Sequence, residues 1–355
     1  MISKLEAFGF GGKVLAWIQN YLSNRTQRVK VGSSLSSFVS VISGVPQGSV
    51  LGPLLFLLYI NDLVDVFGDF LSVKLFADDV KVYVVIDSAV KVQMLQDGLD
   101  LLKTWSDNWQ LDLSLHKCVI LHIGNDSNKS RNVCHSYTIG GVQLPVKTET
   151  SDLGVIVDSK LRFDKHIASI VNKAHGRAAL IRRCFRSKDF ILLFRAFTVF
   201  IRPMLEYCSS VWNLPPHYYC HVAKIESVQR RFIKYIGSRN FMNYPERLQI
   251  LKTESLELRR LKFDLNMIYC VIHNLNALDS SKFFDMCNSS SRGHSLKIRK
   301  QFGRVNCRAF SFANRCVDAW NSLNNEVVFA SSLSNFKKKL KDVDFSAFFT
   351  FLGMM

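Results

Sequence analysis

The sequence predicts an α+β fold, with a small antiparallel sheet and its helices first and a long helical region after it. Between residues 28 and 158, short apolar runs alternate with turn residues, which is the pattern of β-hairpins. From Phe163 onward, apolar residues recur at helical spacing and prolines interrupt the segments. With 355 residues, of which 48% are hydrophobic, the chain can bury a sizeable core and form two or three domains.

The N-terminal elements follow from local patterns. A helix is predicted over residues 13–22, where apolar side chains share one face. Residues 28–31 and 38–42 predict two strands, joined by a serine-rich turn over 32–37. Apolar residues at helical spacing predict another helix over 88–110.

The later elements are a strand, a loop, two hairpins and a series of helices. The strand is predicted at 111–121, the loop at 124–136 and the hairpins at 137–144 and 150–158. Long helices are predicted at 164–186, 188–213, 217–237 and 245–275, followed by a less regular stretch at 276–311 and short helices at 312–323 and 333–340.

Residues 43–53 predict a turn that opens into a helix. The segment holds three glycines and two prolines in eleven residues. Pro46 fixes its own φ, whereas Gly44 and Gly48 permit backbone conformations that other residues resist. Ser49 is a suitable N-cap for the apolar helix that follows, whose free amides would favour a nearby phosphate. The alternative is a structural turn into a buried helix.

Asp78 and Asp79 are adjacent carboxylates between two alternating apolar runs, 73–77 and 80–85. This pattern predicts a strand–turn–strand with both acids at its tip. Carboxylate oxygen is a preferred ligand of Mg²⁺, and a cation would relieve the repulsion between the two charges. The alternative is a polar hairpin turn, for which aspartate is an ordinary choice.

The order and spacing of these two segments resemble motifs B and C of the reverse transcriptases of non-LTR retrotransposons, of the jockey-like or LINE-like kind. The resemblance implies an RNA-directed DNA polymerase that uses two Mg²⁺ ions for nucleotidyl transfer. Asp78 would ligate Mg²⁺ and Asp79 would support the metal site. Pro46, Gln47 and Gly48 would contact the incoming nucleotide and the template.

Two further segments match this family less specifically. Lys117 lies where motif D carries a lysine that acts as a general acid on departing pyrophosphate, although Leu113-Ser114 replaces the usual Phe-Asn. A surface lysine on a strand is the alternative. Leu153 and Gly154 lie in a segment that resembles motif E, the primer grip, and the alternative there is a glycine-containing strand pair.

The motif A aspartate of the family has no counterpart in the sequence. Before Asp62 the only acidic residue is Glu6. We therefore expect the chain to be N-terminally truncated after motif A and inactive alone, needing the missing N-terminal portion of the element's polyprotein. The alternative is a catalytically dead relic that still binds nucleic acid, and a third hypothesis is a decayed element that does not fold fully.

The chain is strongly basic, with a formal net charge of +17. Residues 159–262 hold 21 Lys/Arg against 7 Asp/Glu, which favours a polyanionic partner. By the resemblance, the partners are an RNA template, a DNA primer or hybrid duplex, and dNTP. The alternative is a solvated basic face over an aromatic core.

The resemblance divides the chain into three regions. Residues 1–158 would be a partial fingers and palm with motifs B to E. Residues 159–275 would be a basic helical thumb that holds the duplex by its backbone and shape. Residues 276–355 would be a mostly helical C-terminal tail.

Cysteine usage and hydropathy indicate which cellular compartment to expect and whether the chain would meet a membrane. The nine cysteines are odd in number and include no CxxC pair, which favours reduced thiols in an intracellular, nuclear or cytoplasmic protein. The spacing around Cys208 and Cys220-His221 matches no standard zinc module. The apolar stretches are too short or too interrupted to span a bilayer, so we expect no membrane partner.

Overall fold

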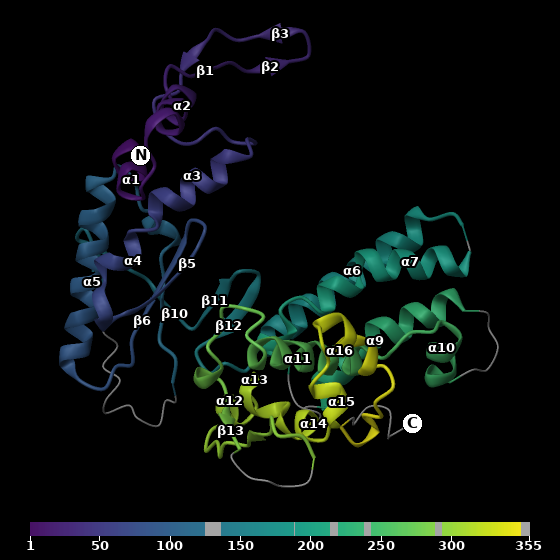
Figure 1. Cartoon of the computed structure of the whole chain (residues 1–355). Helices are drawn as coiled ribbons and strands as arrows, with labels where there is room; N and C mark the ends of the chain where they lie inside the picture. Colours follow the sequence, from purple (N-terminus) through teal and green to yellow (C-terminus); the bar gives the residue numbers. More distant parts are fainter. Residues whose placement is uncertain (125–135, 188, 214–218, 238–242, 288–292, 349–355) are drawn as a thin grey trace. The chain divides into compact units, whose positions relative to one another are not determined.

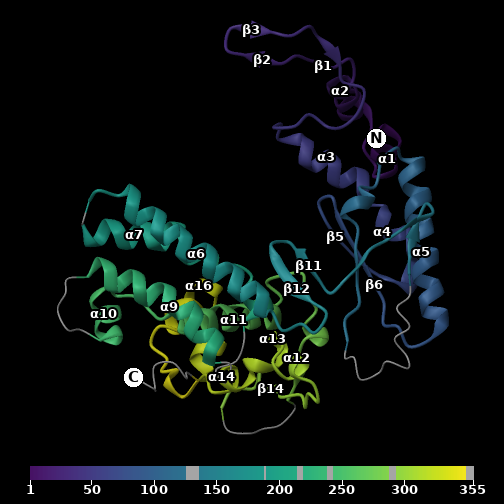
Figure 2. The ribbon, with the colours of Figure 1, turned by 180° about the vertical axis from the view of Figure 1, so that it is seen from behind.

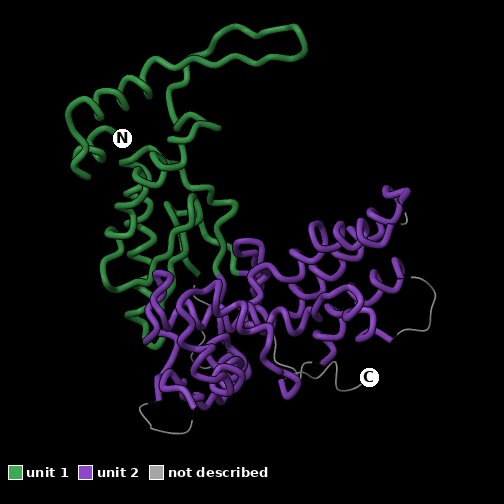
Figure 3. The backbone as a smooth tube through the Cα atoms, turned by 45° about the vertical axis from the view of Figure 1, so that its right-hand side comes forward, with its two compact units in different colours: residues 1–120, 126–146 green, residues 121–125, 147–355 purple. Residues whose placement is uncertain are grey.

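The computed structural model describes residues 1–124, 136–187, 189–213, 219–237, 243–287 and 293–348. They form two compact units, the first of residues 1–120 and 126–146 and the second of residues 121–125 and 147–355 (Figure 3). Helices and small two-stranded sheets make up both units (Figure 1), which confirms the predicted α+β class. The three predicted regions stay a prediction.

The first unit begins with three helices around a small apolar cluster. These are α1 (Ile2–Ala7), α2 (Gly12–Leu22) and α3 (Leu51–Ile60). Leu5, Ile18 and Leu55, one from each helix, are its buried members. The helix predicted at 13–22 is therefore confirmed.

Lys4 of α1 is a buried cation that ties this helix to the segment after α3. Its ammonium donates to the carbonyl of Tyr59 at 2.5 Å and to Asp62 Oδ1 at 2.6 Å. It also lies 3.7 Å from the ring centroid of Trp109. Burial lowers the pKa of Lys4, although the Asp62 carboxylate acts in the opposite direction. The pairing therefore offsets part of the cost of burying the charge.

A long hairpin follows α2. Its ladder is built from β1 (Thr26–Gln27) with β4 (Val39–Ser40) and from β2 (Lys30–Val31) with β3 (Ser34–Leu35). The predicted hairpin is confirmed, but its turn is shorter than the expected 32–37 because Ser34 and Leu35 pair with the opposite strand.

The main core of the first unit lies between a hairpin, a long helix and short elements around them. These are α4 (Leu63–Val66), η1 (Gly68–Phe70), β5 (Ser72–Phe76), β6 (Asp79–Tyr83), α5 (Ala89–Asn108), β8 (Thr138–Ile139) and β9 (Val142–Gln143). Leu99, Leu102 and Trp105 of α5 are buried in this core. The Gln96 amide accepts from the N–H of Thr138 and donates to its C=O, which fixes β8 on α5.

The strand predicted at 111–121 is mostly wrong. The structure has a 3₁₀ turn, η2 (Leu115–Lys117), and only the short strand β7 (Ile120–Leu121). The backbone at 111–118 is used in turns: the Leu111 N–H donates to Ser106, and the Lys117 N–H donates to Ser114. The loop predicted at 124–136 lies almost wholly outside the described residues.

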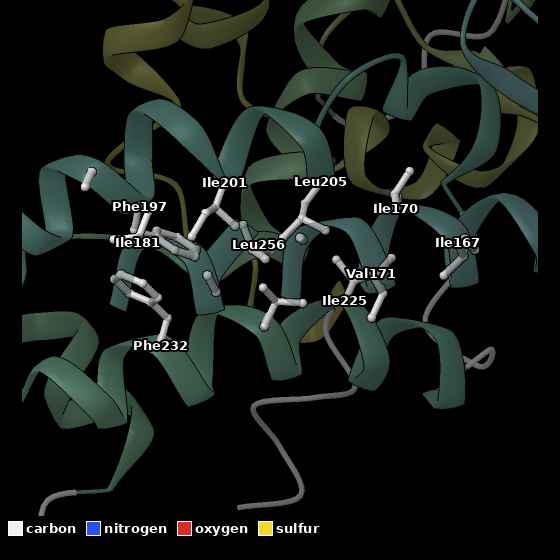
Figure 4. Packing of buried hydrophobic residues seen from close by; sticks show 14 of the residues in the cluster. Ile167, Ile170, Val171, Ile181, Phe197, Ile201, Leu205, Ile225, Phe232 and Leu256 are labelled. Atoms are coloured by element: carbon white, nitrogen blue, oxygen red, sulfur yellow. The ribbon is translucent and has the colours of Figure 1, made fainter. Parts of the chain in front are cut away.

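The second unit opens with β10 (Val146–Lys147) at the boundary, the hairpin β11 (Glu149–Asp152)–β12 (Val155–Asp158) and the helix α6 (Asp164–Cys184). Next come α7 (Phe190–Phe200), η4 (Arg202–Leu205), α8 (Ser209–Trp212) and α9 (Tyr219–Ile236). Figure 2 shows α6 beside α7 and α9. Their shared core includes Ile181, Phe197, Leu205, Ile225 and Phe232 (Figure 4).

Two of the predicted long helices are broken. The one at 188–213 is divided into α7, η4 and α8, because Pro203 cannot donate a backbone hydrogen bond and Cys208 is left-handed at φ 51°. The one at 245–275 is divided into α10 (Tyr244–Ile250) and α11 (Leu256–Ile272). Between them Lys252 is left-handed at φ 47°, and Ser255 caps the second helix.

The C-terminal residues share a core with α11. Their elements are η5 (Ser280–Lys282), β13 (Asp285–Met286), β14 (Ile298–Arg299), α12 (Asn306–Ala309), α13 (Phe312–Arg315), α14 (Val317–Asn321), α15 (Asn325–Val328), α16 (Leu333–Lys339) and η6 (Ser346–Phe348). Trp320 and Phe336 are fully buried with Leu265 and Ile268 of α11. The stretch predicted as a tail is therefore integral to the second unit. Across the described residues, no helix combines the length and apolar character needed to cross a bilayer.

We predict that residues 1–60 are the least protected part of the isolated chain. Few side chains there are buried, and Ile42 and Val50 are each 94% exposed. The β5–β6 sheet has two strands among the described residues, so its outer edges are open to pairing with another chain. Hydrogen exchange followed by mass spectrometry should show faster exchange in α2 and α3 than in α6 and α11. Equal protection of all four helices would contradict this prediction.

Candidate functional site

Asp78 and Asp79 lie at the turn of the β5–β6 hairpin. The strands pair antiparallel, with Phe76 opposite Asp79 and Leu75 opposite Val80. Ala77 turns the chain in the left-handed conformation, at φ 49°. Both aspartates are exposed, and neither carboxylate is hydrogen bonded or ion paired to another described residue. The predicted strand–turn–strand is confirmed, and the turn presents four unshared carboxylate oxygens to solvent.

These two carboxylates fit Mg²⁺ in type. Mg²⁺ in nucleotide-handling sites is commonly held by one or two carboxylates, with water and substrate phosphates completing the octahedron. In the part of the chain that the structure describes, no three His, Cys, Asp or Glu side chains gather into a ready metal site. The hairpin can therefore supply part of a magnesium site, and further ligands must come from elsewhere.

Pro46, Gln47 and Gly48 form a tight turn before α3. Ser49 organises this turn: its hydroxyl donates to the carbonyl of Pro46 at 2.8 Å and accepts from the Gly52 N–H at 2.9 Å. The prediction of Ser49 as the N-cap is wrong by one residue, because the helix begins at Leu51 and Val50 occupies the N-cap position. Ser49 still accepts from the Gly52 N–H, one position before the N-cap. Gln47 and Gly48 are exposed.

Glycine is required at two positions of this turn. Gly48 has φ +80°, a conformation that other residues adopt only with strain. A Cβ on Gly52 would lie 2.6 Å from the carbonyl oxygen of Pro46, so a side chain there would force the turn off the helix. Gln47 and Gly48 remain exposed on this tight turn.

Lys117 lies in η2, with its side chain exposed. No hydrogen bond or ion pair between described residues joins Lys117, the 46–48 turn and the Asp78–Asp79 turn to one another. Among the predicted residues of the first unit, the described contacts thus connect none of these three groups to another. The roles of Lys117, Pro46, Gln47 and Gly48 stay predictions.

Leu153 and Gly154 form the turn of the β11–β12 hairpin in the second unit. Both are left-handed, at φ 45° and φ 83°. The Tyr207 hydroxyl donates to the Leu153 carbonyl at 3.1 Å, and its ring would lie 3.6 Å from a Cβ on Gly154. The predicted hairpin is confirmed, and its turn is held from one side by an aromatic side chain.

His166 and Trp212 hold the same hairpin from within the core. The Ile156 N–H donates to His166 Nδ1 at 3.2 Å, so the ring must carry its proton on Nε2. Burial, with a contribution from the Lys173 charge, lowers the pKa of His166 and keeps the ring neutral. Its ring centroid lies 5.4 Å from that of Trp212, whose indole N–H donates to the Tyr207 carbonyl at 2.7 Å.

Asp158 makes the third connection, between the end of β12 and α6. Its carboxylate accepts from the backbone N–H groups of Lys160, Arg162 and Phe163 at 2.9–3.0 Å. Partial burial acts to raise the pKa of Asp158, but these three donors and the Arg162 charge outweigh burial and lower it. The bonds also hold Leu161 and Phe163 in the left-handed conformation.

A buried polar network connects the hairpin supports to the C-terminal elements. Arg315 of α13 pairs with Asp264 of α11 at 3.0 Å, and both side chains are at most 3% exposed. Arg315 also donates to the Ser210 carbonyl at 2.8 Å. Asn213, directly after Trp212, donates to Asp264 and accepts from Arg260. The segment 207–213 is therefore fixed to the hairpin on one side and to α11 and α13 on the other.

Exposed cations occur along both α6 and α9, and we refer to five of them collectively as the basic face. It consists of Lys173, Arg177 and Arg182 on α6 and Arg231 and Lys234 on α9. The two helices pack side by side (Figure 2). Burial and then the charges of Arg231 and Arg182 lower the pKa of His175, so cations from both helices surround this residue.

The aromatic residues of this region divide into core and surface. Phe197 and Trp212 are fully buried and Phe232 is 3% exposed, so these three belong to the core. Tyr235 is exposed beside the basic face and lies under the Arg182 guanidinium at 5.3 Å.

Sequence reasoning missed His166 and Asp158 as supports of the hairpin. Their nearness in sequence to the 150–158 hairpin was the only available signal.

We predict that Asp158→Asn destabilises the protein more at pH 7 than at pH 3. Because the folded-state pKa is depressed, the carboxylate stabilises the fold above its ordinary pKa, and this contribution disappears as pH falls through the folded-state value. Loss of its charged hydrogen bonds should cost about 1–3 kcal/mol at pH 7. Urea denaturation at both pH values measures the difference. The exposed Asp112→Asn serves as control, and an equal loss for Asp158→Asn at both pH values would refute the mechanism.

Comparison with known proteins identifies one matching family model, described as reverse transcriptase (RNA-dependent DNA polymerase), over residues 1–157. Both candidate turns of the first unit and the β11–β12 turn lie inside this range.

Several curated proteins are also similar. A probable RNA-directed DNA polymerase from transposon X-element of Drosophila melanogaster is 28% identical over 235 residues. The RNA-directed DNA polymerase from mobile element jockey of the same organism is 25% identical over 230 residues. Each alignment covers 62% of this chain and 24% of the relative, so the chain spans about a quarter of their length. A Pol polyprotein from a type-1 retrotransposable element R1 of Nasonia vitripennis is 28% identical over 178 residues, covering 48% of this chain and 43% of the relative.

Proposed function

Because residues 1–157 belong to the reverse transcriptase (RNA-dependent DNA polymerase) family and the chain resembles polymerases of jockey-like non-LTR retrotransposons, we propose that it is part of an RNA-directed DNA polymerase. The observation that carries the proposal is the β5–β6 hairpin. Its turn presents Asp78 and Asp79 to solvent, and no described side chain neutralises them.

In this function Asp78 and Asp79 would hold Mg²⁺ through their exposed oxygens. When bound, the metal supplies charge stabilisation for nucleotidyl transfer from dNTP to a primer 3′-hydroxyl. The exposed residues Gln47 and Gly48, next to Pro46, would lie against the nucleotide and template. Lys117, whose side chain is exposed, would give a proton to the departing pyrophosphate.

The second unit would hold the template–primer duplex. A duplex of RNA and DNA is recognised mainly by its backbone and shape, and the basic face offers five cations for its phosphates. The turn at Leu153 and Gly154 would hold the primer terminus. Its three supports, Tyr207, His166 and Asp158, favour this role, because a positioning element must be rigid. Residues 1–158, 159–275 and 276–355 would then correspond to fingers and palm, thumb and a C-terminal extension.

A further carboxylate, from outside this sequence, would be needed to complete the metal site. No aspartate precedes Asp62, so a motif A carboxylate would have to come from a further part of a longer gene product. Losing one of the bridging carboxylates removes electrostatic stabilisation worth several kcal/mol. We therefore expect the printed chain alone to be inactive or nearly so.

A second candidate function is nucleic-acid binding without catalysis. It is favoured by the excess of 21 Lys/Arg over 7 Asp/Glu in residues 159–262, which does not depend on a complete metal site. Such a chain would retain an RNA or hybrid duplex on the basic face.

We predict that the purified chain does not extend a DNA primer on a poly(A) template with Mg²⁺, and that adding an upstream segment with the motif A aspartate restores extension. Restored activity should fall by at least about 100-fold in Asp78→Asn, the scale expected when one group that stabilises transition-state charge is removed. Single-turnover primer extension measures this effect. Extension by the printed chain alone, abolished by Asp78→Asn, would show that another carboxylate takes the place of motif A.

We further predict that Lys173→Ala/Arg177→Ala weakens binding of an RNA–DNA hybrid. Each lost phosphate contact should reduce the slope of log K against log salt concentration by about 0.7–0.9. Fluorescence anisotropy from about 50 to 200 mM salt measures this slope. Lys282→Ala/Lys338→Ala removes the same charge from exposed positions outside the basic face. An identical slope change in both double variants would mean that net charge, and not this face, accounts for binding.

A further inference from the structure

A small basic pocket lies between α11 and α16 in the second unit, and no residue of the basic face lines it. Its charged lining residues are Arg259, Lys262, Lys337 and Lys341, with Glu254 as the acid. The lysine run at 337–339, apparent in the sequence, contributes to it from α16. We refer to it as the α11–α16 pocket.

The pocket is held in place by the hydrophobic core beneath it. Phe336, next to Lys337, is fully buried and stacks on Tyr269 of α11 with ring centroids 4.4 Å apart. The Tyr269 hydroxyl donates to the Ala330 carbonyl at 2.6 Å, just before α16. The backbone that carries Lys337 is therefore fixed against α11 before any ligand arrives.

The cations of this pocket differ in how they are neutralised. Arg259 is paired with Glu206 through two hydrogen bonds, and Lys262 is paired with Glu254 at 2.7 Å. The ammonium groups of Lys337 and Lys341 form no hydrogen bond or ion pair with any other residue that the structure describes. Two ammonium groups are thus left without an anion in a concave site.

The size of the pocket limits the ligand. Its volume is about 150 Å³. Sites for whole cofactors or nucleotides are typically about 300–1,000 Å³. The pocket accommodates a phosphate-sized group, whereas a complete nucleotide would extend beyond it.

We propose that the α11–α16 pocket binds a phosphate group, and that in the working protein this is a backbone phosphate of the nucleic acid. Lysine acts as a point charge toward phosphate and needs no fixed geometry, which suits Lys337 and Lys341. Arg259 and Lys262, held by their carboxylates, add positive potential. The nucleic-acid part of this inference rests on the proposed function, whereas the phosphate site itself does not.

Binding to single-stranded RNA and to an RNA–DNA hybrid by the full chain tests the inference. Lys337→Ala/Lys341→Ala should weaken binding several-fold and reduce the salt slope by about one phosphate contact, or 0.7–0.9. The control Lys282→Ala/Lys338→Ala should change the slope less, since neither residue lines the pocket. Unchanged melting temperatures would show that both double variants remain folded. Equal effects of the two double variants would overturn the inference.

Lysine acetylation footprinting with mass spectrometry separates the possible phosphate sources. Protection of Lys337 and Lys341, but not Lys338, by both inorganic phosphate and RNA supports the proposal. Protection by phosphate alone would leave a free-phosphate site and reject nucleic acid as its occupant. Equal protection by polyglutamate at matched ionic strength would indicate an acidic protein instead, and protection by none of these would reject the site. If the whole chain binds no nucleic acid, the proposed function is refuted. The phosphate site is then decided by whether inorganic phosphate protects Lys337 and Lys341.

Discussion

The buried ion pair between Arg315 and Asp264 is the interaction on which the second unit most depends. Both charges are removed from water, so neither can lose its partner without a penalty of about 3–5 kcal/mol. The same pair binds the segment 207–213 through Ser210 and Asn213, and that segment supports the β11–β12 turn through Tyr207. The Arg315–Asp264 contact is thereby linked, through the segment 207–213, to a candidate primer-holding turn.

Because of this linkage, the C-terminal residues are a structural part of the second unit and not a separable extension. Trp320 and Phe336 share one core with α11, and α11 also packs against α8 and α9. A truncation before α13 would remove Arg315 and leave Asp264 buried without its cation. The helices that carry the basic face therefore cannot be separated from residues 276–348 without exposing both a hydrophobic core and an uncompensated charge.

Local sequence patterns predicted the hairpins well because the turns contain residue types that favour turn conformations. Gly140-Gly141, Gly154 and Asp78 are residues that turns favour, and alternating apolar residues fixed the strands on each side. The long helices were predicted less well, since their interruptions depend on Cys208 and Lys252 in a left-handed conformation that neither residue prefers. Motif spacing placed the candidate site residues on turns. It could not identify Tyr207 as a support, because that residue is 54 positions from Leu153.

The two candidate turns differ in what holds them. The β11–β12 hairpin is held by Tyr207 and His166 from two other segments and by Asp158 at the end of β12, so its geometry is determined by the protein. The β5–β6 turn brings two carboxylates together with no ion pair to another described residue, and their mutual repulsion opposes a closely packed arrangement. A divalent cation would reverse the sign of this interaction. Under the proposed function, metal binding and ordering of the Asp78–Asp79 turn are therefore coupled, and the metal site becomes well defined only when substrate phosphates and a further carboxylate complete it.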